Sequence, residues 1–554
     1  MGFLLTLLSV FRIAVIPAQF QDTGFTYSPG DFRPVLDRAE QYLNDQFRGS
    51  MTFEFTLASP VTLRHGISWY GANPSGAHDQ GIYEAVTEAV KASGSEIDFS
   101  QFDNDGDGTV DCIALLTAGL SESDGAGEDA IWPQQGWLHE KQAEFSIGGK
   151  TADAFIAFTE LKSDLGRNPR LAGIGDLCHE LLHILGLPDF YDVNGETSGL
   201  SKGLWATTAL MDSGNRNDDG RTPPNLGAIE LECLGLGQCD TLGTGEYTLS
   251  PIDRDGRYLK IVGDIKDEYI LLECREAKGW DAFIGGSGLL AYHVDRSEPD
   301  YSAFWASNTV NADASHPGAF ILEAAPEADN VSKVFFPQPG HTALTSQTHP
   351  AMGFKDGSMS PLAITGITKE PDGCVSFKVT EPVRITEITV FQDAAIISWE
   401  LDTATKDGWR KVSWYRDGIR IGSAEVAGCD SFTIEHLDPQ TEYTVSVSIT
   451  TAEGAPCAAY APFKTKTFRK EIHPYIYLRD SDRHPDGSFN RGARIPLRIF
   501  NVIDAEATEW TFEGHPIATG PDGYFTITES GRLKAKIYHG DGTVDLIIKD
   551  IVVQ

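Results

Sequence analysis

A change in hydrophobic patterning near Glu381 is the feature that most constrains the fold of this 554-residue chain. Before that point, amphipathic segments with helical periodicity at 34–47 and 81–92 are interspersed with strand-like apolar runs. These runs occupy residues 12–18, 113–117, 151–158, 269–272 and 289–294. After Glu381, short alternating strands follow one another between turn signals, and no helix of useful length is expected. The sequence therefore predicts a multidomain protein with an α/β (α+β) catalytic domain over residues 1–380, β-rich from about 240, followed by all-β structure.

The all-β part divides into two predicted sandwich domains. Residues 381–468 place Trp399 early and contain a run from Leu437 to Tyr443 that leads into alternating valines, which is typical of a β-sandwich. That run resembles the one found in fibronectin type III modules. Residues 469–554 repeat the pattern and are predicted to form an immunoglobulin-like sandwich. Neither segment carries a cluster of catalytic residue types, so we expect accessory domains that bind a glycan or a protein ligand.

The charge balance limits the partners of the chain. It has 44 Lys and Arg against 80 Asp and Glu, a net charge of −36, which argues against nucleic acid or an anionic membrane as the main partner. The excess carboxylates are groups of the kind that can hold calcium. The longest uncharged apolar run, residues 2–11, is half of the ~20 residues that a membrane-spanning helix needs.

The start of the chain and its cysteines are two features that can indicate the cellular compartment of the protein. Residues 2–10 are consistent with the remnant of a signal sequence, but no basic residue precedes them, so we expect a chain already trimmed at its start. The eight cysteines form no C-x-x-C pair. Buried thiols, or one or two disulfides, are favoured over a metal-binding or redox role.

The segment from Cys178 to Asp189 carries the chemistry of the sequence. His179-Glu180-x-x-His183 on a helix puts both imidazoles on one face, four residues apart, where they can bind one zinc ion. Glu180 then lies beside the metal without binding it, and it can act as general base on a zinc-bound water. We therefore predict a hydrolytic zinc site in which Glu180 is the catalytic residue.

The residues that follow extend this motif. Gly186 allows the chain to leave the helix, and Asp189 stands where the metzincin pattern H-E-x-x-H-x-x-G-x-x-H has its third histidine ligand. A carboxylate is an acceptable zinc ligand, so Asp189 is predicted as the third one. Met211, in a turn-rich segment downstream, is predicted to be the Met-turn beneath the metal.

The stretch from His179 to Asp192 resembles the active-site signature of the immune inhibitor A family of bacterial metallopeptidases. The resemblance extends weakly over residues 12–380, including Phe20-Gln21-Asp22. It implies secretion, or a place at the bacterial surface, and zinc-dependent endopeptidase activity with structural calcium. The chain departs from the family pattern in having no room for a signal and a propeptide before residue 12. Its predicted sandwiches also differ from the family's familiar appendages, so they do not indicate the substrate.

A second candidate metal site is the acidic loop with Asp103, Asp105, Asp107 and Asp111. The spacing begins like an EF-hand loop, but Ala114 stands where the bidentate glutamate is required. We predict a calcium loop of another kind, with a solvated acidic turn as the alternative.

Past the zinc motif, three polar residues form a further candidate cation site, and a plain polar turn explains them equally well. They are Asp192, Asn194 and Glu196.

Two more residues are candidates for the active site. Tyr191 is suited to donate to a developing oxyanion, or it is a packed aromatic residue beside the site. His293 is either a contact of the substrate or of a metal ligand, or a histidine satisfied within the core.

The leading hypothesis from the sequence is a secreted zinc endopeptidase that acts on extracellular proteins. The first alternative is a catalytically silent binding protein at a cell surface, built on a peptidase scaffold. The intact His179-Glu180-x-x-His183 set speaks against it, because a decayed enzyme does not need Glu180. The second alternative is a zinc hydrolase that cleaves non-peptide amides or esters.

Overall fold

The computed structural model forms two compact units. Unit 1 comprises residues 1–344, 348–356 and 364–380, and unit 2 comprises residues 345–347, 357–363 and 381–554. The structure describes residues 9–73, 79–194, 205–263, 265–297, 300–313, 315–328, 330–466, 474–478, 483–502, 505–520, 522–540 and 542–554.

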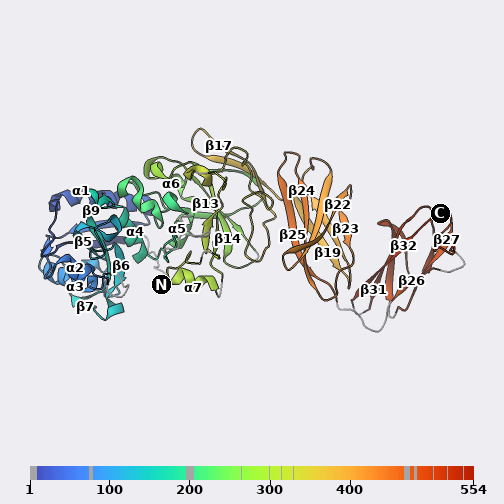
Figure 1. Cartoon of the computed structure of the whole chain (residues 1–554), viewed down its shortest axis with the longest axis horizontal. Coiled ribbons are helices and arrows are strands. Elements are labelled where there is room, and N and C mark those ends of the chain that lie inside the picture. Colours follow the sequence, from blue (N-terminus) through green and yellow to red (C-terminus); the bar gives the residue numbers. More distant parts are fainter. Residues whose placement is uncertain are drawn as a thin grey trace. The chain divides into compact units, whose positions relative to one another are not determined.

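A seven-stranded mixed sheet organises the first part of unit 1 (Figure 1). Its main order is β10-β9-β5-β1-β2, with β3 beside β1 and β6 beside β9. The pairs of β1 with β2 and β5, and of β5 with β9, are parallel, whereas β6 and β10 run antiparallel to β9. In chain order the strands are β1 (Ser9–Gln19), β2 (Met51–Leu57), β3 (Val61–Thr62), β5 (Ile113–Leu120), β6 (Gln134–Trp137), β9 (Ala154–Asp164) and β10 (Arg167–Leu171).

Helices cover both faces of this sheet, which explains why β1 is apolar along its length. Phe11, Ile13 and Val15 pack in one core with α1 and α4, and the alternate residues Ala14 and Ile16 pack in another with α3. Figure 1 shows α1 on one side of the sheet and α2 and α3 on the other. The helices are α1 (Pro29–Phe47), α2 (Ile67–Gly71), α3 (Ile82–Ser93) and α4 (Gly175–Ile184). A small sheet joins β4 (Thr109–Val110), β8 (Lys150–Ala152) and β7 (Phe145–Ile147).

The rest of unit 1 is β-rich. A five-stranded sheet contains β11 (Gln238–Thr241), β13 (Arg257–Val262), β14 (Glu268–Arg275), β15 (Gly288–Asp295) and β16 (Ala319–Ile321). A three-stranded sheet contains β12 (Gly245–Leu249), β17 (Ala363–Lys369) and β18 (Val375–Thr380). The helices here are short: α5 (Ala228–Cys233), α6 (Ile252–Asp255) and α7 (Asp300–Ala306).

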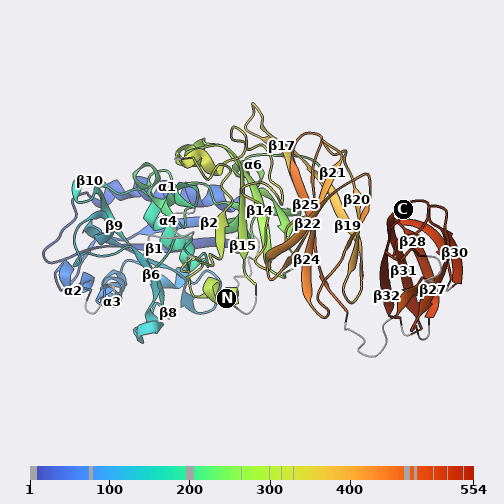
Figure 2. The same ribbon diagram turned by 45° about the vertical axis from the view of Figure 1, so that its right-hand side comes forward.

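Unit 2 consists of two successive pairs of antiparallel sheets, each pair having three strands in one sheet and four in the other (Figure 2). The first pair holds β19 (Val383–Val390), β20 (Ala395–Leu401) and β23 (Ser431–Ile434), then β21 (Trp409–Arg416), β22 (Ile419–Ala427), β24 (Glu442–Thr450) and β25 (Pro456–Lys464). The second holds β26 (Tyr475–Tyr477), β27 (Arg494–Phe500) and β30 (Asp522–Thr526), then β28 (Ala505–Phe512), β29 (His515–Thr519), β31 (Gly531–His539) and β32 (Val544–Ile551). Trp399 and Trp510 are buried, each in the core of its own pair.

The mixed α/β first part and the β-sheets of the C-terminal part agree with the predicted multidomain class. The prediction of one continuous strand over residues 151–158 is wrong, because these residues are divided between β8 and β9. Between the two strands, the carbonyl and the carboxylate of Asp153 accept hydrogen bonds from the amides of Leu138 and His139. All eight cysteines are free thiols. None of the helices in the described ranges is long and apolar enough to cross a membrane.

Candidate active site

The two histidines lie on the polar side of helix α4, because the opposite side of the helix is buried in the core. Leu177, Leu181 and Leu182 are buried in the cluster that includes α1. Gly175 lets the start of the helix approach the chain at Asn215, since a Cβ there would lie 1.8 Å from that carbonyl oxygen. The polar side of the helix is thereby held against the segment that follows the predicted Met-turn.

The chain turns back on itself after α4 and carries Asp189 to the histidines. Gly186 has φ +100°, a conformation that favours glycine, as the sequence predicts for the residue that leaves the helix. The amide of Leu187 donates to the carbonyl of Leu182 over 3.0 Å and closes the turn. Asp189 then lies with its carboxylate between the two imidazoles.

Three potential metal ligands converge at this place. Oδ1 of Asp189 is 3.1 Å from Nε2 of His179 and 3.3 Å from Nε2 of His183. The three atoms lie within 4.8 Å of one another, and all three side chains are at least nine-tenths buried.

The hydrogen bonds around the histidines leave these atoms available to a metal. Nδ1 of His179 lies 2.9 Å from the carbonyl oxygen of Leu210, and Nδ1 of His183 lies 2.7 Å from that of Leu187. Because a carbonyl only accepts, Nδ1 carries the proton and Nε2 of the neutral ring has a free lone pair. Oδ1 of Asp189 is buried and accepts no hydrogen bond, which would be costly unless a cation lies beside it. The donor set therefore fits a zinc ion.

Glu180 is mostly buried beside these ligands and lines the pocket described below. Burial raises the pKa of its carboxyl, the two histidines oppose this and Asp189 adds to it, giving a pKa of about 7. A pKa near neutrality suits a group that must both take up and release a proton. Burial also raises the pKa of Asp189, but contact with His179 and His183 outweighs it and holds that pKa far below the ordinary range.

Met211 is fully buried under the helix, in the same core as Leu181 and Leu182. Its carbonyl accepts a 2.8 Å hydrogen bond from the amide of Phe190, and its own amide donates to Glu230 over 3.3 Å. The turn that precedes it also supplies the Leu210 carbonyl to His179. The structure therefore joins the predicted Met-turn to a predicted ligand through one backbone group.

A cavity of about 320 Å³ opens beside Glu180. Its lining combines aromatic, acidic and basic side chains, among them Trp132, Asp176, His179, Tyr191, Asp212 and Arg216. The Tyr191 side chain is 39% exposed at this cavity, and burial together with the charge of Asp189 raises its pKa. Tyr191 is therefore brought to the predicted site.

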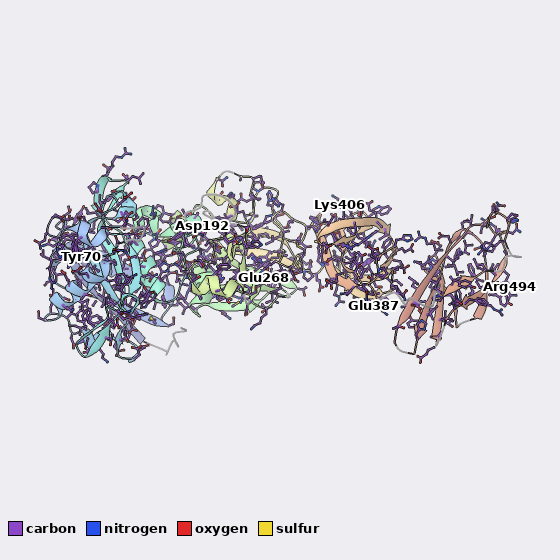
Figure 3. The ribbon with its side chains drawn as sticks, turned by 60° about the horizontal axis from the view of Figure 1, so that its bottom comes forward. Tyr70, Asp192, Glu268, Glu387, Lys406 and Arg494 are labelled. Atoms are coloured by element: carbon purple, nitrogen blue, oxygen red, sulfur yellow. The ribbon has the colours of Figure 1, made fainter. Side chains whose placement is uncertain are left out.

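His293 lies elsewhere. It is buried on β15, stacks on Phe320 with ring centroids 5.0 Å apart, and pairs with Glu268 at 2.7 Å (Figure 3 labels Glu268). It is absent from the lining of the cavity beside Glu180. The position is in the core, but Nδ1 of His293 is buried without a hydrogen-bond partner in the described residues, so the histidine is only partly satisfied there.

The acidic loop brings together three of its four predicted ligands. Carboxylate oxygens of Asp103, Asp105 and Asp111 lie within 4.8 Å of one another. Asp107 is outside this group and accepts a 2.7 Å hydrogen bond from the amide of Thr109. Nζ of Lys150 lies 2.5 Å from Oδ2 of Asp103, so an ammonium group already neutralises part of the cluster.

The third candidate cation site falls partly outside the described residues, because Glu196 belongs to the segment 195–204. Asp192 accepts the amide hydrogen of Asn194 over 2.9 Å, which is the hydrogen bond of a polar turn. In the described part of the chain, the only groups of three metal-binding side chains are the two at Asp189 and Asp103.

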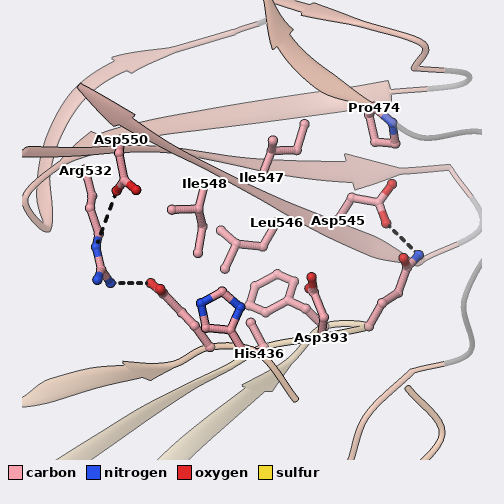
Figure 4. A pocket seen from close by; sticks show the side chains of 13 residues that line it. Asp393, His436, Pro474, Arg532, Asp545, Leu546, Ile547, Ile548 and Asp550 are labelled. Carbon is pink, nitrogen blue, oxygen red and sulfur yellow. Dashed lines mark hydrogen bonds and ion pairs between the residues drawn. The ribbon is translucent and has the colours of Figure 1, made fainter. Parts of the chain in front are cut away.

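Unit 2 contains a cavity of about 400 Å³ with an acidic lining (Figure 4). Its arginine, Arg532, lies 2.7 Å from Glu435 and 3.7 Å from Asp550, so its charge is satisfied within the lining. His436, Asp393 and Asp545 also line this cavity.

Several residues of the site were not found from the sequence. Asn308 contacts Asp189, Glu230 holds Met211, and Asp176, Asp212 and Arg216 line the cavity. They come from separate segments without a motif of their own. The only local signal is the sequence around Met211. Its neighbour Asp212 caps the following segment, because its carboxylate accepts a hydrogen bond from the amide of Ser213.

Comparison with known proteins gives this part of the chain a class. Residues 17–229 match the family model described as "Immune inhibitor A peptidase M6, catalytic domain". The resemblance predicted from the sequence is confirmed for this segment.

Two individual relatives support the match. Immune inhibitor A of Bacillus thuringiensis subsp. alesti is 30% identical over 201 residues, which cover 31% of this chain and 29% of that protein. Pre-pro-metalloprotease PrtV of Vibrio cholerae serotype O1 (strain M66-2) is 26% identical over 219 residues, covering 35% of this chain and 23% of that protein. The chain thus spans less than a third of the length of either relative.

Among solved structures, a central fibronectin-III array of RIM-binding protein matches 31% of this chain at 10% identity. Its TM-score of 0.13 is too low to assign a fold.

Proposed function

We propose that this chain is a secreted zinc-dependent endopeptidase with a metzincin-like active site that hydrolyses peptide bonds of extracellular proteins. The observation that carries the proposal is the convergence of Nε2 of His179, Nε2 of His183 and the unpartnered Oδ1 of Asp189 beside a buried Glu180. The match to a peptidase catalytic domain, and the similarity to a protein called a metalloprotease, support it.

His179, His183 and Asp189 would hold the zinc ion. When bound, zinc supplies a Lewis acid that polarises the scissile carbonyl and makes water a nucleophile at neutral pH. Glu180 takes the proton from the attacking water and then delivers it to the leaving nitrogen, for which a pKa of about 7 is suited. Tyr191 donates a hydrogen bond to the oxygen that becomes negative during the attack.

The proposal includes the domain organisation predicted from the sequence. Residues 1–380 form the catalytic domain, residues 381–468 a fibronectin type III-like sandwich, and residues 469–554 an immunoglobulin-like sandwich that with its neighbour binds a glycan or protein. The pairs of three- and four-stranded sheets in unit 2 support two sandwiches.

Calcium binding at the acidic loop is the second part of the proposal. Burial and the nearby charges of Asp105 and Asp107 raise the pKa of Asp111 to about 6, although the amide of Asn104 opposes the shift. A divalent cation would relieve this repulsion. The role we assign to calcium is stabilisation of the catalytic domain.

The test is cleavage of casein by the full chain and by Glu180→Gln, with zinc content measured on the same samples. The variant should keep about one zinc per chain and lose several orders of magnitude in kcat/KM, because the amide cannot take up the proton. Glu144→Gln, at an exposed position, is the matched control and should retain wild-type cleavage. Undiminished cleavage by Glu180→Gln would overturn the proposal, and so would a wild-type chain that binds zinc but cleaves no protein.

A further inference from the structure

Asn308 holds Asp189 by two reciprocal hydrogen bonds. The amide hydrogen of Asp189 is donated to Oδ1 of Asn308 over 2.6 Å, and Nδ2 of Asn308 donates to Oδ2 of Asp189 over 2.8 Å. One side chain therefore fixes both the backbone and the carboxylate of the proposed third ligand.

These bonds determine which carboxylate oxygen faces the histidines. Oδ2 is engaged by Asn308, whereas Oδ1 accepts no hydrogen bond and points to both Nε2 atoms. Without Asn308, the carboxylate loses the hydrogen bond from Nδ2 that fixes which oxygen faces the histidines, and only the hydrogen bond from the Tyr191 side chain to the same carboxylate is left. Hydrogen bonds to the second oxygen of a ligating carboxylate orient such ligands in metalloproteins.

The backbone of Asn308 is suited to this task. Its φ is +55°, in the left-handed region, which asparagine tolerates better than most residues. The residue lies two positions after the end of α7, and the turn lets its amide reach back to the loop after α4.

Two further amide contacts hold the same two segments together. Nδ2 of the buried Asn311 donates to the carbonyl of Phe190 over 2.8 Å, and Nδ2 of Asn194 donates to the carbonyl of Ala312 over 2.9 Å. Asn311 is also tied to the amide of Ala319 in β16. Residues 308–312 thus run beside residues 189–194 and are anchored to the five-stranded sheet.

We propose that Asn308 is a positioning residue for the zinc site, so that the metal affinity of the catalytic segment 17–229 depends on a side chain outside it. The proposal rests on the zinc site of the proposed function. It assigns the β-rich part of unit 1 a direct role in metal binding, through the strap of residues 308–312.

The experiment compares zinc affinity in the full chain, its Asn308→Gly and Asn308→Asp variants and the control Asn168→Gly, by competition with a chromophoric chelator. Glycine keeps the left-handed backbone and removes both hydrogen bonds. Aspartate can still accept from the amide of Asp189 but sets a carboxylate against Oδ2. We expect the zinc dissociation constant to rise about 10–100-fold in Asn308→Gly and at least as much in Asn308→Asp. Asn168→Gly, at an exposed asparagine of β10 that also has a left-handed φ (+52°) and donates from Nδ2 to the carboxylate of Asp164, should bind zinc like the wild type.

A second readout separates positioning from general stability. The thermal midpoint of the zinc-free protein should change little in Asn308→Gly, while the increase on adding zinc becomes smaller. Wild-type zinc affinity in Asn308→Gly would overturn the inference, and so would equal weakening by Asn168→Gly. If Asn308→Gly does not fold, zinc affinity is measured in Asn308→Asp instead, and wild-type affinity in that variant would overturn the inference. Failure of the wild-type chain to bind zinc would instead refute the proposed function.

Discussion

His179 and Met211 are linked through a single backbone group, because Nδ1 of His179 bonds the carbonyl of Leu210, the residue directly before Met211. The sulfur-containing side chain is fully buried in the core beneath the helix. Packing in this core and the orientation of a candidate ligand are thereby coupled.

Met211→Ala should therefore weaken both stability and zinc binding. Loss of a buried methionine side chain costs about 2–5 kcal/mol, whereas Met211→Leu should cost less than about 1.5 kcal/mol. Urea unfolding of the zinc-free protein and chelator competition measure the two effects. Met352→Ala is the matched control, since Met352 is equally buried but lies outside this core, and it should lower stability with unchanged zinc affinity. Unaltered zinc affinity in Met211→Ala would contradict the coupling.

Asp189→Ala should lose more zinc affinity than any change at Asn308, because it removes a donor atom rather than its support. We expect a fall of more than about 100-fold, beyond the range typical of residues that only orient a ligand. Asp37→Ala, at an exposed position on α1, serves as the control. Zinc bound by Asp189→Ala as tightly as by the wild type would exclude Asp189 as the third ligand.

Asp79 should make stability depend on pH. Its carboxyl is fully buried and accepts from the amide of Trp132, and burial raises its pKa from 3.8 to about 7. Between these values the folded protein holds a proton that the unfolded chain releases, so the contribution of Asp79 to stability falls as the pH rises from about 4 to about 7.

In Asp79→Asn this contribution is removed. As the pH rises from 4 to 7, the melting temperature of Asp79→Asn should increase relative to that of the wild type. Above pH 7 the difference between the two melting temperatures should remain constant. Differential scanning calorimetry at several pH values measures this. Parallel curves for the two proteins would show that Asp79 titrates alike in both states.

The acidic loop should respond to calcium. Addition of calcium should raise the melting temperature of the wild type, by mass action on the folded state, and Asp111→Asn should reduce that increase. Lys150→Met should enlarge it, since the ammonium beside Asp103 competes with a cation for the same carboxylate. Equal responses of all three proteins would refute calcium binding at this loop.

The sequence was most informative where spacing alone fixes geometry. A four-residue interval on a helix places His179 and His183 side by side, and their Nε2 atoms do converge on one carboxylate oxygen. The glycine at position 186 also has the positive φ that a turn towards Asp189 requires. In the fold, the apolar run of β1 follows from burial on both faces of the sheet.

The contacts that could not be predicted join segments far apart in the chain. Asn308 reaches Asp189 across 119 positions, and nothing in the sequence around it indicates that partner. Asp79 meets Trp132 across 53 positions in the same way. The division of residues 151–158 was missed because Asp153 bonds an adjoining loop instead of continuing a strand.

The reach of Asn308 sets an order of events for the nascent chain. Asp189 leaves the ribosome more than a hundred residues before Asn308, so a nascent chain ending after α5 has both histidines and a proposed third ligand that lacks its two hydrogen bonds to Asn308. In the proposed function, tight zinc binding then requires residues 308–312 to dock. A chain cut short before that point would carry the whole signature from His179 to Asp189 without the side chain that we propose orients its carboxylate.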